Sequence, residues 1–182
     1  MRVIAGDKKG LILKTLDGGD IVRPTTDKVK EAVFSSVQFE LEHCAFLDLF
    51  AGSGQMGIEA LSRGAKTAFF VDENRKSISV CKENLTRAGY ISSGAVVIHS
   101  DCRAFLLSVD DKFDIAFLDP PYGKELINSV LPMVAQVVKP GGTIICESSA
   151  DEELPTEAGE FSIDRVRKYG KIKITYYTQN QN

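Results

Sequence analysis

The stretch Ala45-Phe46-Leu47-Asp48-Leu49-Phe50-Ala51-Gly52-Ser53-Gly54-Gln55-Met56-Gly57 decides the fold. An apolar run typical of a buried strand leads directly into a glycine-rich loop, and an apolar helix follows over residues 58–61. Gly52, Gly54 and Gly57 fit the spacing Gly-x-Gly-x-x-Gly, in which small residues let the backbone approach a ligand at a helix N-terminus. The stretch therefore predicts a strand, a ligand-binding loop and a helix.

A carboxylate stands just before this loop, at Asp48. It would repel a pyrophosphate, but it suits an amino group or a cationic sulfonium. This charge favours S-adenosyl-L-methionine (SAM) over NAD as the ligand of the loop. The alternative is a tight strand-to-helix turn with a solvated acid.

Apolar runs and helical periodicity alternate over residues 45–147, which implies a doubly wound, mostly parallel, Rossmann-like α/β sheet. Two prolines interrupt the pattern. Pro132 should kink or split a helix over 126–137, and Pro140-Gly141-Gly142 predicts a turn. Further strands are expected at 67–71, 95–98, 114–118 and 143–147.

Hairpins are expected at both ends of the chain. Residues 161–166 and 172–177 predict an antiparallel C-terminal pair, and residues 1–14 predict a small N-terminal β-hairpin. We expect one domain over 1–182, in which a hairpin extension (1–22) precedes a catalytic core (23–182).

Composition excludes several classes of protein. The 182 residues are 43% hydrophobic and 26% charged, and the net charge is −3. This charge argues against a protein that coats nucleic acid by bulk charge, although segments 1–16 and 165–173 are locally basic. The four cysteines are widely spaced, which predicts reduced thiols and no metal site. With no apolar stretch of membrane-spanning length and no signal peptide, we expect a cytoplasmic monomer.

Acidic side chains follow four of the expected strands. Asp48, Asp72, Asp101 and Asp119 should therefore lie along one edge of the sheet. Asp72 can accept both hydroxyls of a ribose, and Asp101 can read an adenine amino group. Each acid alone has the plainer interpretation of a loop acid or a helix cap.

The last of these acids opens the motif Asp119-Pro120-Pro121-Tyr122. Two prolines end strand pairing and stiffen the loop. The Asp119 carboxylate and the Pro120 carbonyl can then accept hydrogen bonds from one amino group, while Tyr122 offers a flat face to a planar substrate. This arrangement suits methylation of an exocyclic nitrogen on a nucleobase.

Two pairs of motifs carry a family resemblance. Asp-Leu-Phe-Ala-Gly-Ser-Gly over 48–54 with Asp-Pro-Pro-Tyr over 119–122 resembles the Rossmann-like SAM-dependent methyltransferases of exocyclic nitrogens. Arg-Pro-Thr-Thr-Asp-Lys-Val-Lys-Glu over 23–31, preceded by Arg-Val-Ile-Ala-Gly over 2–6, resembles more specifically the RsmD-type guanine-N2 methyltransferases of small-subunit (16S) ribosomal RNA. The resemblance covers nearly the whole chain.

This resemblance implies roles for individual residues. Asp48, Gly52 and Gly54 would hold the methionine end of SAM, Asp72 its ribose, and Asp101 with Cys102 its adenine. The target guanine would be held by Asp119, Pro120, Pro121 and Tyr122, with Arg23, Thr25 and Thr26 near the reaction centre. From their charge, Lys8, Lys9 and Lys14 are candidates for phosphate contacts, or else a solvated basic face.

The expected reaction is direct methyl transfer to the guanine amino nitrogen, which leaves S-adenosyl-L-homocysteine. The partner would be ribosomal RNA, the small subunit or an assembly intermediate. Alternatives within the same chemistry are a DNA adenine, another RNA or a protein glutamine amide. Two further classes are an NAD-dependent oxidoreductase and a non-catalytic RNA-binding module.

Overall fold

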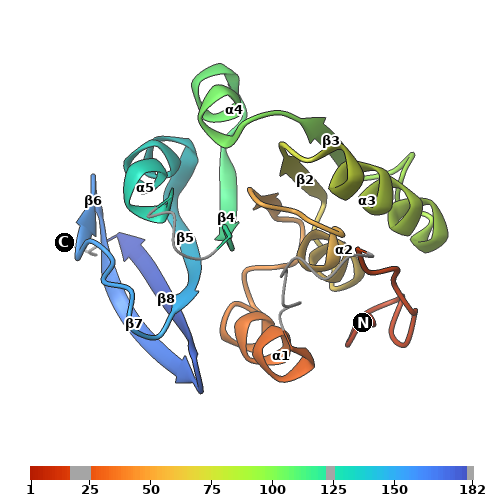
Figure 1. Cartoon of the computed structure of the whole chain (residues 1–182), viewed down its shortest axis with the longest axis horizontal. Helices are drawn as coiled ribbons and strands as arrows, with labels where there is room; N and C mark the ends of the chain where they lie inside the picture. Colours follow the sequence, from red (N-terminus) through yellow and green to blue (C-terminus); the bar gives the residue numbers. More distant parts are fainter. Residues whose placement is uncertain (17–25, 122–125, 180–182) are drawn as a thin grey trace.

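A computed structural model describes residues 1–16, 26–121 and 126–179 (Figure 1). Helices and strands alternate in it from residue 45 to residue 149, as the periodicity predicts. The elements are, in chain order, α1 (Asp27–Ser36), β1 (Ala45–Asp48), α2 (Gln55–Ser62), β2 (Thr67–Asp72), α3 (Arg75–Ala88), β3 (Ala95–His99), α4 (Cys102–Ser108), β4 (Phe113–Leu118), α5 (Leu126–Val137), β5 (Val138–Ser149), β6 (Glu157–Ala158), β7 (Phe161–Tyr169) and β8 (Ile172–Gln179).

In the described residues, eight strands form one sheet in the order β3-β2-β1-β4-β5-β8-β7-β6. The five strands from β3 to β5 pair in parallel, and β8, β7 and β6 add an antiparallel edge. This confirms the predicted fold class. The chain leaves β1 toward β2 and β3, then crosses to β4 on the other side of β1. The switch point of the sheet therefore lies between β1 and β4, where open α/β sheets bind ligands.

Two apolar clusters cover the two faces of the sheet. In Figure 1 the helices α1, α2 and α3 lie below the sheet, and α4 and α5 lie above it. Phe46 and Leu47 are neighbours on β1, yet each belongs to a different cluster and neither is exposed. The alternation follows from the two-residue period of a strand, because both faces of a parallel sheet are covered by helices.

Polar caps and a glycine delimit two of the helices. Thr26 Oγ1 accepts a hydrogen bond from the Val29 N–H at 3.4 Å at the start of α1. Asn74 caps the start of α3, and Gly89 ends that helix with φ +79°. Glycine adopts this left-handed conformation with less strain than other residues do, which explains why the helix ends there.

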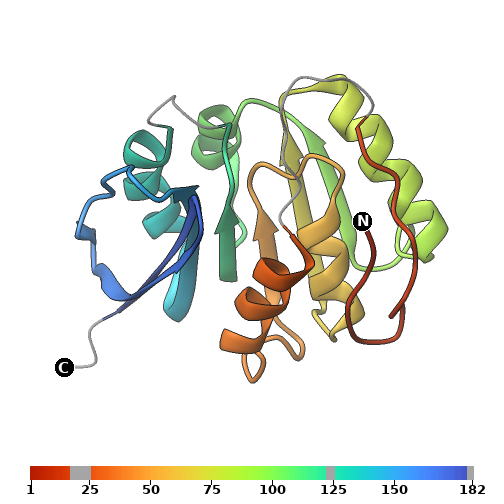
Figure 2. The same cartoon turned by 60° about the horizontal axis from the view of Figure 1, so that its bottom comes forward.

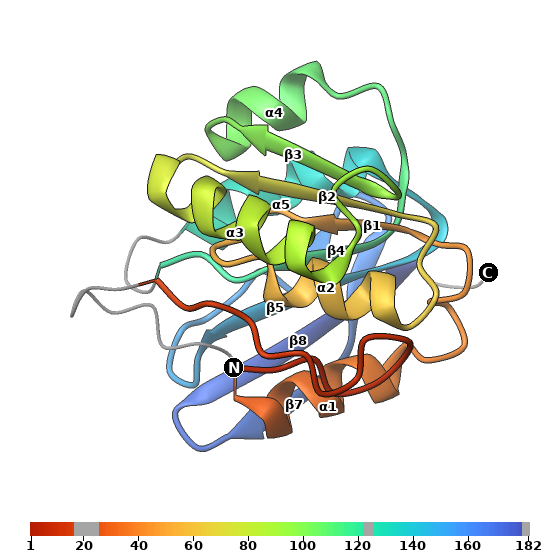
Figure 3. The same cartoon turned by 90° about the vertical axis from the view of Figure 1, so that its right-hand side faces the viewer.

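The N-terminal hairpin is confirmed by its backbone hydrogen bonds. Val3 N–H donates to the Leu11 carbonyl at 2.9 Å, and Gly10 N–H donates to the Val3 carbonyl at 2.9 Å. Its tip reaches the C-terminal end of α2, where Asp7 N–H donates to the Ser62 carbonyl at 2.9 Å. Figure 3 shows this hairpin along the outer side of α2.

The turn predicted at Pro140-Gly141-Gly142 is wrong, and one of the two effects predicted for Pro132 is absent. Pro140-Gly141-Gly142 lies inside β5, where the pairing with β4 advances from Phe113↔Val138 to Ile115↔Thr143 through a bulge. Gly142 passes so close to β4 that a Cβ there would lie 2.6 Å from the Asp114 carbonyl oxygen. Pro132 does not split α5, which is continuous with Pro132 on its exposed side, and a kink at this residue stays a prediction.

Candidate functional site

The four acids predicted to share an edge do so. Asp48 ends β1, Asp72 ends β2, Asp101 follows β3 and Asp119 follows β4. Because these strands are parallel neighbours, the acids follow one another along the sheet as Asp101, Asp72, Asp48 and Asp119. We call this the carboxyl edge, and the opposite side, where the parallel strands begin, the amino edge. Asp48 and Asp119 flank the switch point.

Asp48 is a buried acid, 2% exposed, and its Oδ2 accepts a hydrogen bond from the Gly57 N–H at 3.1 Å. Burial raises the pKa of Asp48 to about 7; the Gly57 N–H opposes the rise, and the negative charge of Asp72 adds to it. A cationic group bound beside Asp48 would favour the ionised form. The site is therefore suited to an amino group or a sulfonium.

Asp72 connects the glycine loop to the end of β2. Its Oδ2 accepts the Gly52 N–H at 2.8 Å, and its Oδ1 accepts the Asn74 N–H at 2.7 Å. The loop after β1 is thus held by the neighbouring strand. The same carboxylate has further lone pairs for ligand hydroxyls, because a carboxylate accepts about four hydrogen bonds.

The three glycines of the loop serve different purposes. A Cβ on Gly54 would lie 2.7 Å from Cys81 Sγ, and a Cβ on Gly57 would lie 2.3 Å from Phe70 Cε1. Gly57 thus allows α2 to pack closely on β2, and Gly54 allows the loop to approach Cys81 on α3. A Cβ on Gly52 would meet nothing within 4 Å. Gly52 therefore borders open space on the ligand side of the loop.

Asp101 is the N-cap of α4. Its Oδ1 accepts the Arg103 N–H at 2.9 Å and the Ala104 N–H at 3.0 Å. Asp101 is therefore a helix cap, the plainer of the two interpretations. Its side chain remains exposed beside the end of β2. The next residue, Cys102, is buried, and burial raises the pKa of its thiol. Cys102 is thus a packing residue and not a reactive thiolate.

The acceptor motif follows β4 directly. Asp119 is partly buried, Pro120 is buried and Pro121 is exposed, so the chain turns outward at this point. Tyr122 lies outside the described residues. The position of Asp119 beside the switch point is what the motif predicts for a group that contacts substrate.

The start of α1 carries part of the family-specific motif. Arg23 and Thr25 lie outside the described residues, and Thr26 is the N-cap described above. Asp27, next to it, pairs with Arg2 at 3.1 Å (Oδ2 to Nε). The base of the N-terminal hairpin is thereby linked to the beginning of α1.

Lys8 and Lys9 are not brought to the carboxyl edge. Lys8 N–H donates to Ser62 Oγ at 3.0 Å, at the last residue of α2, which is on the amino edge. The Lys8 ammonium lies 3.4 Å from Asp7 Oδ2 and over the ring of Tyr90. Lys14 is nearer the glycine loop, but it pairs with Glu83 at 2.7 Å.

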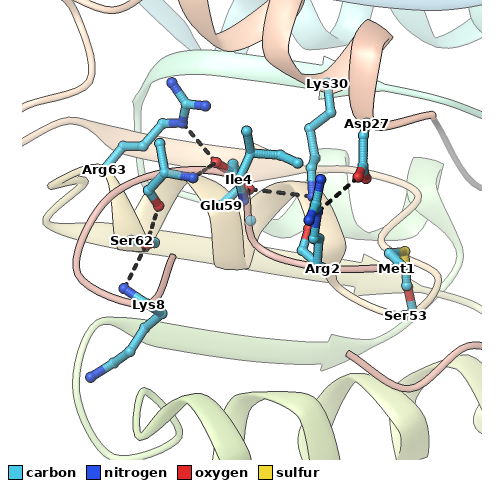
Figure 4. A network of polar contacts seen from close by, with 12 residues as sticks. Met1, Arg2, Ile4, Lys8, Asp27, Lys30, Ser53, Glu59, Ser62 and Arg63 are labelled. Atoms are coloured by element: carbon cyan, nitrogen blue, oxygen red, sulfur yellow. Dashed lines mark hydrogen bonds and ion pairs between the residues drawn. The ribbon is translucent and has the colours of Figure 1, made fainter. Parts of the chain in front are cut away.

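A buried polar network that the sequence reasoning missed joins the N-terminal hairpin and α1 to α2, the helix that follows the glycine loop (Figure 4). Glu59 on α2 accepts the N–H groups of Ile4 and Ala5 at 2.8 and 3.0 Å, and it pairs with Lys30 at 3.3 Å and Arg63 at 2.8 Å. The signal was available: Glu59 is the one charged residue within the apolar start of its helix, residues 56–61. A fully buried acid requires such partners.

A second contact holds the loop from α3. Asn84 is buried, and its Nδ2 donates to the Ser53 carbonyl at 2.9 Å and to the Lys14 carbonyl at 3.0 Å. Its Oδ1 accepts the Lys14 N–H at 2.8 Å. One amide side chain thus joins the hairpin to the glycine loop.

A cavity of about 330 Å³ lies at the amino edge and not at this site. The Asp114–Lys139 ion pair, 2.9 Å between Oδ2 and Nζ, forms one wall, and Gly142 forms another. Being at the start of β4 and within β5, it is remote from the four acids. It has no part in the site described here.

The polar groups of the carboxyl edge suit an organic ligand that has amino and hydroxyl groups. It combines carboxylates, open backbone at Gly52 and a buried acid that a cation would ionise. In the described part of the chain, no three His, Cys, Asp or Glu side chains are grouped as metal ligands would be. None of the described helices is both long and apolar enough to cross a bilayer.

Known proteins resemble this chain over nearly its full length. A family model described as conserved hypothetical protein 95 matches residues 1–178. A Bacillus subtilis protein named as a candidate rRNA methyltransferase, YlbH, is 38% identical, with 97% of this chain and 98% of that protein covered. Ribosomal RNA small subunit methyltransferase D of Haemophilus influenzae is 34% identical, with 86% and 82% covered. The solved structure of a candidate Escherichia coli methyltransferase, YhhF, has a TM-score of 0.87 at 29% identity, with 98% and 97% covered.

Proposed function

The chain belongs to the family described as conserved hypothetical protein 95, and from this membership we propose that it is a SAM-dependent methyltransferase of small-subunit ribosomal RNA. The observation that carries the proposal is the line of four acids across the switch point, with the acceptor motif at one end. The names of the two relatives supply the class of substrate. Guanine N2 is the acceptor atom that we propose.

The cofactor would lie along the carboxyl edge. Asp48 and the backbone at Gly52 and Gly54 would hold its amino-acid end, because a buried carboxylate gains most from a nearby cation. Asp72 would accept its ribose hydroxyls, and Asp101 with Cys102 would flank its adenine. When bound, SAM supplies an electrophilic methyl group. The open side of Gly52 supports this assignment.

The chain's own part in the reaction is to position the acceptor. The guanine amino nitrogen is a poor nucleophile, because its lone pair is delocalised into the ring. Hydrogen bonds from that amino group to the Asp119 carboxylate and the Pro120 carbonyl would orient the lone pair, and most of the rate gain would come from this positioning. Asp119 would also stabilise positive charge that develops on the nitrogen.

The neighbouring residues would hold the base in place. Tyr122 would stack on the guanine, a contact worth about 1–3 kcal/mol, which offsets part of the few kcal/mol needed to turn a base out of its stack. Pro121, which is exposed, and Thr26, the N-cap of α1, would line the same entrance. The resemblance assigns Arg23 and Thr25 to it as well.

The test is methyl transfer from labelled SAM to small ribosomal subunits isolated from cells that lack this gene. The RNA is digested and its nucleosides are separated, with naked RNA, DNA and protein run in parallel. Label in N2-methylguanosine is the expected result. Label in another nucleoside would show that the acceptor atom is not guanine N2. Label in DNA or in a glutamine amide would show that the substrate is not ribosomal RNA. If the protein bound SAM but no fraction became labelled, the proposed methyltransferase activity would be contradicted.

A further inference from the structure

The end of β7, the turn and the start of β8 carry a dense basic segment. Residues 165–173 hold five basic residues and no acidic one. The chain as a whole has a net charge of −3, so this local concentration is opposite to the overall balance. Basic residues that cluster in an acidic protein mark a surface for an anionic partner.

The register of the sheet places this segment at the carboxyl edge. Leu118 on β4 aligns with Cys146 on β5, Cys146 with Thr175 on β8, and Thr175 with Val166 on β7. The residues one step further along, Asp119 and Arg167, are therefore level with each other across the sheet. Figure 3 shows the β7–β8 turn on the side toward which β1 and β2 point, and the tip of the N-terminal hairpin on the opposite side.

Three strand spacings of about 4.8 Å separate β4 from β7, so Arg167 lies roughly 14 Å along the sheet from Asp119. Lys168, Gly170 and Lys171 continue from Arg167 in the same direction, away from the amino edge. A target base at Asp119 would thus have its flanking backbone within reach of this turn.

Three of the five basic side chains are available. Arg167, Lys168 and Lys171 are exposed, and within the described residues no carboxylate pairs with them. The other two are engaged in the fold. Arg165 packs over the ring of Tyr176 and donates to the Ser36 carbonyl, and Lys173 donates to the Glu152 carbonyl.

Protection of a sheet edge explains only part of this charge. Beyond Ser162, β7 has no further strand beside it in the described residues, and lysines on such an edge prevent edge-to-edge association. However, Lys168 stands directly opposite Lys173, a like-charged pair that destabilises a sheet. Lys171 lies in the turn and protects no edge. An anionic ligand bound to the exposed Lys168 ammonium would offset this repulsion.

We propose that Arg167 and Lys168, which leave opposite faces of the sheet at the end of β7, and Lys171 in the turn form a phosphate-binding surface around the β7–β8 turn. This surface holds the RNA backbone beside the target base, and the proposal rests on the proposed function. The surface sets the affinity for RNA and not the chemistry. This surface has the phosphate-binding role that charge alone suggested for Lys8 and Lys9, whose hairpin tip lies at the amino edge.

The experiment compares two triple variants that each remove one arginine and two lysines. R167Q/K168Q/K171Q removes the proposed surface. K66Q/R87Q/K112Q removes three exposed cations at the amino edge: Lys66 precedes β2, Arg87 ends α3 and Lys112 precedes β4. Binding of small subunits is measured by filter retention over a range of salt, with KM and kcat for methyl transfer and the Kd for SAM.

For R167Q/K168Q/K171Q, Kd and KM for subunits should rise about tenfold or more, and the slope of log Kd against log salt should fall by about 2. The kcat and the SAM affinity should stay within about twofold of wild type, as should every parameter of the amino-edge variant. Equal losses of subunit affinity in the two triple variants would show an effect of net charge alone and would overturn the proposal. Unchanged subunit binding in R167Q/K168Q/K171Q would also overturn it. Filter retention needs no catalysis, so an inactive wild type would contradict the proposed function and leave this test decisive.

Discussion

Lys30 on α1 and Glu59 on α2 form an ion pair that solvent does not reach: Nζ and Oε2 are 3.3 Å apart, and both side chains are 0% exposed. Burial lowers the pKa of Lys30 more than the attraction of Glu59 raises it. Lys30 also donates to the Arg2 carbonyl, and Glu59 accepts from Ile4 and Ala5. One pair therefore joins α1, the N-terminal hairpin and the helix that begins at the glycine loop.

Lys30→Met should destabilise the protein by about 3–5 kcal/mol, because it leaves the Glu59 carboxylate buried with fewer partners. The free energy of unfolding in urea, measured at neutral pH, gives the value. Lys14→Met is the matched control: its ion pair with Glu83 is about half exposed, and such surface pairs contribute about 0–1 kcal/mol. A loss below 1 kcal/mol in Lys30→Met would show that the hairpin and α1 are held mainly by apolar packing.

Asp48 should make the unliganded protein less stable as the pH rises. The folded protein raises the pKa of this acid to about 7 from an ordinary 3.8, so it binds the proton more tightly than the unfolded chain does. The contribution of Asp48 is complete below about pH 4 and is lost as the pH rises to about 7. At about 1.4 kcal/mol per pKa unit, the loss is up to about 4 kcal/mol. The measurement is the difference in unfolding free energy between wild type and Asp48→Asn from pH 4 to pH 8. If this difference in unfolding free energy did not change with pH, Asp48 would not be a buried acid that is protonated in the folded protein.

The same acid should give SAM binding the opposite pH dependence. If the ionised carboxylate holds the ligand's α-ammonium group, the affinity falls about tenfold for each pH unit below about 7. It falls again above about pH 8, where the ligand's amino group loses its proton. Isothermal titration calorimetry with SAM from pH 5 to pH 9 tests this, and Asp48→Asn should bind weakly with no such slope. Equal pH profiles in the two proteins would place the amino group elsewhere.

Much of this site can be predicted from sequence, because a strand's end and a helix's cap are local. The glycine loop and the acids at 48, 72, 101 and 119 are each next to an apolar run, and parallel pairing then brings them together. Contacts across long sequence separations are different. Nothing near Glu59 or Asn84 indicates that their partners lie at residues 4, 5, 14 and 30. Likewise, the contact of the hairpin tip with Ser62 places Lys8 far from the acids. The order of strands makes Arg167 level with Asp119.

Two alanine substitutions should separate packing from ligand binding in the glycine loop. Gly57→Ala places a Cβ 2.3 Å from Phe70 Cε1, and such overpacking costs about 1–3 kcal/mol of stability. Gly52→Ala meets no atom, so its stability loss is about 1–2 kcal/mol, from its φ of +53° alone. SAM affinity should fall most in Gly52→Ala, where the new methyl group enters the open side. Urea unfolding and SAM titration of both variants provide the comparison. If Gly52→Ala bound SAM like wild type, the ligand would not lie against Gly52.

Asp119→Ala should slow methyl transfer at least about a hundredfold and leave SAM binding within about twofold of wild type. Removing an acceptor that positions the amino group and stabilises its developing charge costs about a hundredfold to a thousandfold in rate. Asp119 is at the far end of the line of acids from Asp101, beyond Asp48, so the cofactor contacts remain. Asp111→Ala, an exposed acid at the amino edge before β4, is the matched control and should be fully active. Single-turnover transfer to small subunits measures the chemical step apart from binding. Normal turnover in Asp119→Ala would mean that the amino group is oriented by other residues, and the proposed mechanism would have to be abandoned.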